Sequence, residues 1–201
     1  MTTKAMDRNR ALLGVLLGLG ALAAGCASTQ MTDTWTAPSA KGAELSKVAV
    51  IAMAKDPGLR RMAETSAAQN LVGAQAVPSY QVLGDTDMKD KDAVQQKLKS
   101  QGFQAVLVMR LAGVDERVDF AAAPYATFGE YYGMEGPRIY DPGFVQTDTI
   151  VHVISTLYSL EDQKLIWSGT SQSFDPATAQ SFMNDVSKAV AKSLQKDRVI
   201  L

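Results

Sequence analysis

The chain of 201 residues has one cysteine, one histidine and almost no net charge. The cysteine count and the charge each exclude a class of protein. A single cysteine cannot form an internal disulfide, so the fold must be stabilised by burial alone. A formal net charge of −1 at pH 7 provides no basic field for nucleic acid. We therefore expect neither a disulfide-bonded domain nor a nucleic-acid-binding protein.

The short signatures of common enzyme classes are missing as well. No Gly-x-Ser-x-Gly turn, phosphate-binding glycine loop or His-Glu-x-x-His pattern occurs in the sequence. Residues 85–92 superficially resemble a calcium loop, but Lys89 occupies the third ligand position, and the central glycine and the final glutamate are missing. We interpret residues 85–92 as a helix cap, and we expect a protein without enzymatic activity, metal or cofactor.

The N-terminal residues have the pattern of an export signal. Lys4, Arg8 and Arg10 precede an unbroken apolar run over residues 11–25, which ends in small residues. This combination is typical of a signal peptide. The alternative is a transmembrane anchor, but fifteen apolar residues fall short of the roughly 20 that span hydrocarbon as a helix. We assign residues 1–25 to a signal peptide.

The sequence Leu22-Ala-Ala-Gly-Cys26 resembles the lipobox of bacterial lipoproteins. This resemblance implies that the leader is cut before Cys26, that its thiol receives a diacylglycerol, and that the new amino group is acylated, for example with palmitate. Ala23 departs from the pattern, which prefers leucine there. In a host with two membranes, Ala27 in place of aspartate implies transfer to the outer membrane, with the protein facing the periplasm. Several acyl chains would make this membrane attachment effectively permanent.

The segment that follows the leader predicts a tether. Residues 26–46 are rich in Ser, Thr, Ala, Pro and Gly and have no periodicity, so we expect a lipidated N-terminus and a flexible tether with a reach of roughly 25 Å. We expect Trp35, within this segment, to dock on the domain. Removal of the leader takes away three basic residues and one acidic residue, so the formal net charge of the mature chain becomes −3.

Residues 47–201 predict one α/β domain. Short apolar runs indicate strands, and aspartate before a helical pattern, twice followed by proline, indicates the start of a helix. The expected strands cover residues 48–53, 77–83, 103–109 with an extension to 120, 147–160 and 164–174, and the expected helices follow Asp56, Asp90 and Asp175. Pro78 places its strand at an edge of the sheet, because proline has no N–H for a further neighbour.

This order of elements, βαβαβ-ββα, predicts a single sandwich with a mixed sheet. Its first three strands are parallel in the order 2-1-3, an antiparallel hairpin follows, and helices pack on the sheet. Four segments resemble the small α/β domains of bacterial envelope lipoproteins, many of which have no known function: Lys47-Val-Ala-Val-Ile51, Arg60-Arg-Met-Ala-Glu64 with Val77-Pro-Ser-Tyr80, Gly102-Phe-Gln-Ala-Val-Leu-Val108, and Gln163-Lys-Leu-Ile-Trp-Ser-Gly169. The resemblance implies this fold and an envelope location, and it implies no reaction.

The segment 120–146 is the most unusual part of the domain. It holds half of the aromatic residues of the chain together with four glycines, and it has no periodicity of its own. Segments of this length are often functional, and tyrosine offers a large contact area with a polar tip. We predict contact with a partner through Tyr125, Phe128, Tyr131, Tyr132, Tyr140 and Phe144. The alternative is that these rings cover an open edge of the sheet.

Two further candidates have simpler structural interpretations. His152 is expected in the middle of a strand, without a nearby serine, cysteine or pair of carboxylates, so we expect packing rather than catalysis or metal binding. Arg60 and Glu64 are four residues apart on a predicted helix. We expect them to form an exposed ion pair worth under about 1 kcal/mol.

Three hypotheses for function follow. The first is a non-catalytic, membrane-anchored lipoprotein that binds another envelope protein through residues 120–146, with its oligomeric state left open. The second is an oligomeric subunit of an outer-membrane secretion or assembly apparatus, since curli-type secretion pores are lipoproteins with such excursions. Four charged residues interrupt the lipid-facing alternation that a pore needs, Glu130, Glu135, Arg138 and Asp141. The third is a hydrolase, which requires His152 or carboxylates to meet this segment in a pocket.

Overall fold

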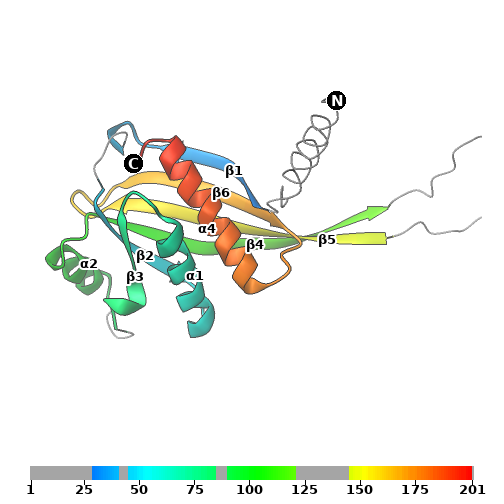
Figure 1. Ribbon diagram of the computed structural model, residues 1–201, viewed down its shortest axis with the longest axis horizontal. Helices are drawn as coiled ribbons and strands as arrows, with labels where there is room; N and C mark the ends of the chain where they lie inside the picture. Colours follow the sequence, from blue (N-terminus) through cyan, green and yellow to red (C-terminus); the bar gives the residue numbers. More distant parts are fainter. Residues whose placement is uncertain (1–28, 41–44, 85–89, 121–144, 201) are drawn as a thin grey trace, which may run out of the picture.

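Six strands form one mixed sheet in the computed structural model, which describes residues 29–40, 45–84, 90–120 and 145–200. The strands are β1 Thr29–Thr36, β2 Lys47–Met53, β3 Gln75–Pro78, β4 Ala105–Phe120, β5 Val145–Ser159 and β6 Leu165–Phe174. The helices are α1 Pro57–Asn70, α2 Lys91–Ser100 and α4 Ala179–Lys196, with 3-10 turns at Pro38–Ala40 and Ser79–Gln81. Figure 1 shows the order of the strands across the sheet, β1-β6-β5-β4-β2-β3.

The predicted α/β class and the predicted parallel strands are confirmed. β2 pairs in parallel with β3 on one side and with β4 on the other, which is the expected order 2-1-3. β5 pairs in antiparallel fashion with β4 and with β6. β3 lies at the edge and ends at Pro78, where the missing N–H meets no further strand.

The prediction of a flexible tether over residues 26–46 is wrong for residues 29–40, which hold a strand and a 3-10 turn. Residues 29–36 form β1, which pairs with β6 from Thr29 opposite Ser173 to Thr36 opposite Trp167. Most β1 side chains are exposed, and Trp35, which we expected to dock, keeps 49% of its surface exposed. The sequence of β1 therefore has no apolar alternation, because this edge strand is held largely by backbone pairing with a distant strand.

Two of the three predicted helix starts are confirmed. The Asp56 side chain accepts a hydrogen bond from the Leu59 N–H (2.8 Å) before α1, and the Asp90 side chain caps α2 in the same way. The third is wrong, because α4 is capped by Thr178 in a capping box with Ser181.

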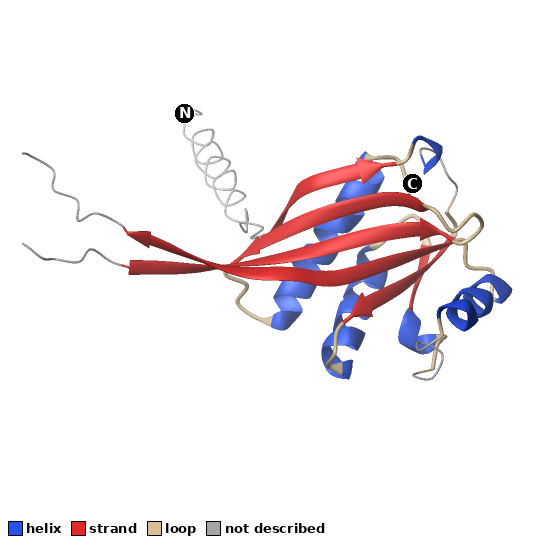
Figure 2. Ribbon diagram, turned by 180° about the vertical axis from the view of Figure 1, so that it is seen from behind, coloured by secondary structure: helices blue, strands red, loops and turns tan. Residues whose placement is uncertain are grey.

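Helices α1 and α4 pack on the same face of the sheet and enclose the larger core (Figure 1). Along α4, Val186, Val190 and Leu194 recur with the helical period and are buried there, and Phe182 at the start of the same row is partly buried. The opposite face is seen from the front in Figure 2, with α1 and α4 behind the strands. A smaller apolar cluster on that face joins Leu98 of α2 to Ala49 and Ile51 of β2, together with Leu83, Phe103 and Leu160.

Glu64 of α1 is wholly buried where β2 ends, so the expected pair with Arg60 forms, but the expectation that it is exposed is wrong. Its Oε1 accepts hydrogen bonds from Arg60 Nε (3.0 Å) and Ser79 Oγ (2.7 Å). Its carboxylate also accepts the backbone N–H groups of Ala52 and Tyr80, each at 3.1 Å. The sequence after Pro78 turns instead of continuing as a strand to residue 83, because Ser79 and Tyr80 bind this carboxylate.

Candidate functional site

The strands β4 and β5 extend past their neighbours and leave the sheet as a two-stranded ribbon (Figure 2). The register of β2 with β4 ends at Met53 and Arg110, and the register of β6 with β5 ends at Phe174 and Ile150. We call residues 111–120 of β4 and their partners in β5 the ribbon. In the part of the chain that the structure describes, β5 is the one strand beside β4 along residues 111–120, and the other edge of β4 has no neighbouring strand there.

A β-bulge at the base of the ribbon places side chains of β4 on the same face of the sheet as the larger core. Leu111 lies opposite Val153, whereas Gly113 lies opposite His152 and Val114 opposite Val151, so one extra residue is inserted in β4. Because paired residues share a face, Leu111 and Val114 both stand on the face that α1 and α4 cover further along. Here the side chains of Leu111 (55%) and Val114 (53%) are exposed. The bulge therefore extends an apolar row beyond the core.

The opposite face of the ribbon base carries His152 and Asp115. Their Nε2 and Oδ2 atoms lie 2.9 Å apart, without the geometry of a hydrogen bond. The side chain of His152 is 20% exposed, and its direct neighbours across the strands are Gly113 and Gln172, neither of which carries a nucleophile. The pair fits a cross-strand contact between charged or polar groups better than a catalytic dyad.

The end of β6 is fastened to β5 at the same place. Asp175 follows β6 with a φ of 42°, and its Oδ1 accepts a hydrogen bond from the Thr149 N–H at 2.7 Å. The Asp175 N–H donates in turn to the Thr149 carbonyl at 2.9 Å. Asp175, which we expected to cap the last helix, therefore holds the base of the ribbon.

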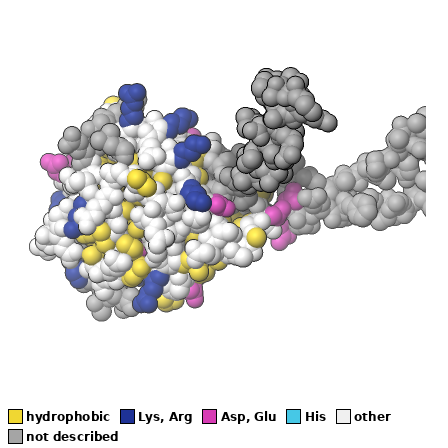
Figure 3. Space-filling model, viewed as in Figure 1, with side chains coloured by type: hydrophobic (Ala, Val, Ile, Leu, Met, Phe, Trp, Pro, Cys, Tyr) yellow, Lys and Arg dark blue, Asp and Glu magenta, His cyan; other side chains and the backbone are white. Residues whose placement is uncertain are grey.

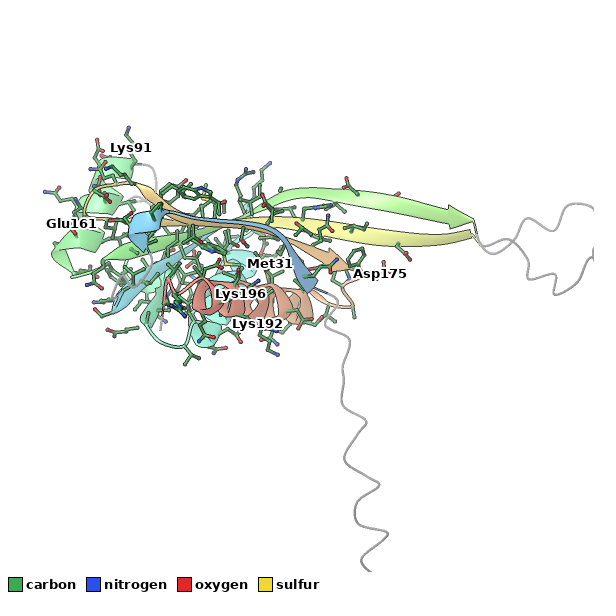
Figure 4. The ribbon with its side chains drawn as sticks, turned by 90° about the horizontal axis from the view of Figure 1, so that it is seen from above. Met31, Lys91, Glu161, Asp175, Lys192 and Lys196 are labelled. Atoms are coloured by element: carbon green, nitrogen blue, oxygen red, sulfur yellow. The ribbon has the colours of Figure 1, made fainter. Side chains whose placement is uncertain are left out.

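The N-terminal strand begins beside this ribbon base. Thr29 is the first residue of β1 and pairs with Ser173, and their hydroxyl groups lie 2.6 Å apart in a buried hydrogen bond. Ser173 precedes Phe174, the last β6 residue opposite β5. Cys26 is only three residues before Thr29 in the sequence. The start of β1 and the ribbon thus share one end of the sheet (Figure 4).

A groove of about 690 Å³ runs between β1 and α4. Its walls are residues Thr29 to Thr34 of β1 and, from α4, Asp185, Lys188, Ala189, Lys192, Ser193 and Lys196. Figure 3 shows basic side chains gathered along this helix, and Figure 4 labels Lys192 and Lys196 on the helix below β1. The spacing of these lysines is visible in the sequence, but their position beside β1 is not.

Several residues proposed from the sequence lie outside the described residues. These are Cys26 and the six aromatic residues of the predicted binding segment, Tyr125, Phe128, Tyr131, Tyr132, Tyr140 and Phe144. Among the described residues, no cluster of three or more His, Cys, Asp or Glu side chains could hold a metal ion. No helix in the described ranges is long and apolar enough to cross a membrane.

Sequence reasoning missed two features of this region, the bulge in β4 and the exposed apolar pair Leu111 and Val114. An apolar alternation that begins at Val114 was visible, but it gave no sign that an inserted residue places Val114 on the core face. A bulge depends on the partner strand, so only the pairing with β5 reveals it.

No protein-family model and no curated protein matches the sequence. Among solved structures, the PelC dodecamer from Paraburkholderia phytofirmans is 15% identical with a TM-score of 0.45, and the match covers 85% of this chain and 97% of PelC. Lipoprotein GNA1162 from Neisseria meningitidis is 14% identical with a TM-score of 0.38, and the match covers 75% of this chain and 99% of GNA1162. A minor lipoprotein from Acinetobacter baumannii is 11% identical with a TM-score of 0.27, and the match covers 77% of this chain and 95% of that lipoprotein.

Proposed function

We propose that this protein is a non-catalytic envelope lipoprotein, anchored through lipid on Cys26, that presents its ribbon and the segment after it to another envelope protein. In a host with two membranes, its place is the periplasmic side of the outer membrane. The observation that carries the proposal is the common position of the two features: β1 starts three residues after Cys26, at the end of the sheet from which the ribbon leaves.

The short chain between Cys26 and β1 limits how far the sheet can lie from the membrane. Three residues of extended chain span at most about 11 Å. The tether expected over residues 26–46 had a reach of more than twice that distance, but its residues Thr29–Thr36 belong to the sheet. A lipid on Cys26 therefore keeps Thr29, and with it the base of the ribbon, close to the membrane surface.

The surface of the ribbon supports binding rather than catalysis. Leu111 and Val114 expose apolar side chains, and within the described residues the edge of β4 that faces away from β5 has no neighbouring strand along the ribbon. An unpaired strand edge binds a partner strand through backbone hydrogen bonds, with side chains providing specificity. We further propose that the aromatic residues of segment 120–146 extend this contact, as their composition predicts.

Site-specific photo-crosslinking in intact cells tests the proposal. A photoreactive residue at Val114 should capture one defined envelope protein, and so should one at Tyr131 or Tyr132. Val72 is a matched control, because it is also an exposed valine (67%) but follows α1, away from the ribbon. The proposal is contradicted if the folded, lipidated protein yields no adduct at Val114, or yields the same adducts at Val72.

The anchor needs a separate test. Cys26→Ala should abolish lipid labelling and leave either soluble protein or uncut precursor. It should also abolish the adduct at Val114, since the partner is expected near the membrane. A variant that keeps its lipid label would contradict the assignment of Cys26.

A second candidate function is favoured by the free sides of the ribbon. Within the described residues, the edge of β4 away from β5 is unpaired beyond Arg110, and β6 stops pairing with β5 at Ile150, so ribbons of several copies could pair edge to edge. The protein would then be a subunit of an oligomeric secretion or assembly apparatus. Sizing of the detergent-extracted, lipidated protein separates the candidates: a large ring supports the oligomer, and a monomer contradicts it.

A further inference from the structure

The groove between β1 and α4 carries a row of three lysines. Lys188, Lys192 and Lys196 are four residues apart, so they share one face of the helix. All three are exposed, and no carboxylate of the described residues lies within ion-pair distance of them. Their ammonium groups are therefore available to an anionic partner along two turns of α4.

The charge of the groove is opposite to that of the rest of the protein. Asp33 and Asp185 also line it, so its five charged residues are three basic and two acidic, with a net positive charge. The mature chain as a whole has a formal net charge of −3 once the leader with its three basic residues and one acidic residue is removed. This side is thus the one that an anionic surface would attract.

The position of the groove close to Cys26 in the sequence indicates which anionic surface it binds. Thr29 lines the groove, and it follows Cys26 by three residues. We propose that the α4–β1 groove binds the anionic head groups of the bilayer to which Cys26 is attached, so that the protein lies on its α4 side. This rests on the proposed lipid on Cys26. The lysine ammonium groups donate hydrogen bonds to lipid phosphates, while Met31 and Ala189 supply apolar contact between them.

This orientation decides how the ribbon meets the membrane. The ribbon continues the direction of the sheet on which α4 lies, so a protein resting on α4 holds its ribbon along the membrane surface (Figure 4). A ribbon that enters the bilayer would instead stand the domain upright and move Lys196 away from the lipid. The orientation therefore distinguishes a ribbon that lies along the membrane from one that enters it.

Fluorescence quenching in vesicles measures the orientation of the full, lipidated chain. Because the diacylglycerol proposed on Cys26 occupies its thiol, one introduced cysteine is the only thiol that a fluorophore can label. Thr34→Cys reports from the exposed wall of the groove, and Gln96→Cys reports from the exposed side of α2 on the opposite sheet face. With a quencher attached to lipid head groups, we expect quenching at Thr34 and little at Gln96, in vesicles that contain phosphatidylglycerol but not in pure phosphatidylcholine.

Charge reversal tests the role of the lysines. In the Thr34→Cys background, the triple change of Lys188, Lys192 and Lys196 to Glu should lower quenching to the level of the Gln96 label. Each lysine near an anionic surface is expected to change the ratio of docked to undocked protein about fivefold. The matched control reverses three exposed lysines elsewhere, Lys55, Lys91 and Lys164, and should leave the quenching unchanged.

The outcomes distinguish failure of this inference from failure of the anchor. A chain that is not acylated and does not stay with the vesicles contradicts the proposed function. A chain that is acylated and retained, but whose Thr34 label is unquenched on anionic vesicles or equally quenched in both triple variants, overturns the groove assignment alone. Quenching at a Glu116→Cys label deep in the bilayer, with none at Thr34, also overturns it and supports a ribbon that enters the membrane.

Discussion

The parallel neighbours β2 and β4 end in contrasting ways. β2 stops at Met53, and the region around its end is closed by Glu64, whose carboxylate binds a guanidinium, a hydroxyl and two backbone N–H groups. β4 continues past Arg110 into the ribbon, where Leu111 and Val114 are exposed. The first region satisfies its polar groups within the domain, whereas the second leaves apolar surface and a strand edge to be covered from outside.

This difference separates stability from binding. A buried, fully paired carboxylate raises the cost of any change near it, because its partners lose their hydrogen bonds together. An exposed ribbon contributes little to the stability of the domain, because two strands without further neighbours are marginal in water. Substitutions should therefore affect unfolding strongly around Glu64 and binding strongly along the ribbon.

The largest effect is expected at Glu64. Glu64→Ala should lower the free energy of unfolding by about 3 kcal/mol or more, because it removes the buried acceptor of the Arg60 Nε–H and of two backbone N–H groups. Urea denaturation measures this change. Glu116→Ala on the ribbon is the control, since Glu116 is exposed, and it should change stability little. Equal losses for the two variants would contradict the contrast.

A smaller loss of stability is expected at Gly169 of β6, against which the ring of Trp167 in the same strand packs. A Cβ at Gly169 would lie 2.6 Å from the Trp167 ring, which is fully buried and donates from Nε1 to Asp197 Oδ2 at 2.9 Å. Gly169→Ala should therefore lower the thermal midpoint, with a loss of about 1–3 kcal/mol. Gly113→Ala in the ribbon is matched to it, because a Cβ there meets no atom within 4 Å. If Gly113→Ala proved as destabilising, the ribbon would be more tightly packed than described.

Asp175 and Thr178, which both lie between β6 and α4, should stabilise different elements. Thr178→Ala removes the cap of α4 and should cost about 1 kcal/mol, with faster amide exchange in the first turn of α4. Asp175→Gly keeps the positive φ of this position but removes the acceptor of the Thr149 N–H. It should speed exchange at Thr149 and leave α4 unchanged. Faster exchange in α4 with Asp175→Gly would restore Asp175 as the helix cap.

The smallest effect on stability is expected on the ribbon itself. Val114→Lys replaces an exposed apolar side chain, so the free energy of unfolding should change by less than about 0.5 kcal/mol. The same variant should abolish the crosslink from Tyr131, because it places a charge on the proposed contact surface. Val72→Lys serves as the control and should keep the crosslink. A retained crosslink with Val114→Lys would remove Val114 from the contact.

The elements that could be predicted from the sequence are those whose signals are local. Asp56 and Asp90 cap helices through residues two or three positions away, and the stripe of Val186, Val190 and Leu194 follows the helical period. The apolar runs that became β2 and β4 are buried on both faces and need no alternation. Such patterns survive in the sequence because the interacting residues are neighbours in it.

The features that escaped prediction depend on contacts between distant residues. β1 is polar, and its pairing with β6 joins Thr29 to Ser173 across most of the chain. Glu64 has the spacing of an exposed helical pair, and only the packing of α1 against the end of β2 buries it. The bulge in β4 is defined by the residues of β5 that lie opposite. None of these partners can be identified from spacing along the chain.

By itself the sequence determined the α/β class, the order β3-β2-β4 of the parallel strands and the caps of α1 and α2, because periodicity and capping act over a few residues. It also determined the composition from which the lipid anchor is proposed. Only the tertiary structure decided that β1 extends the sheet and starts beside the ribbon, and that the lysines of α4 face this strand. These placements result from pairing and packing between segments more than a hundred residues apart, which no local pattern encodes.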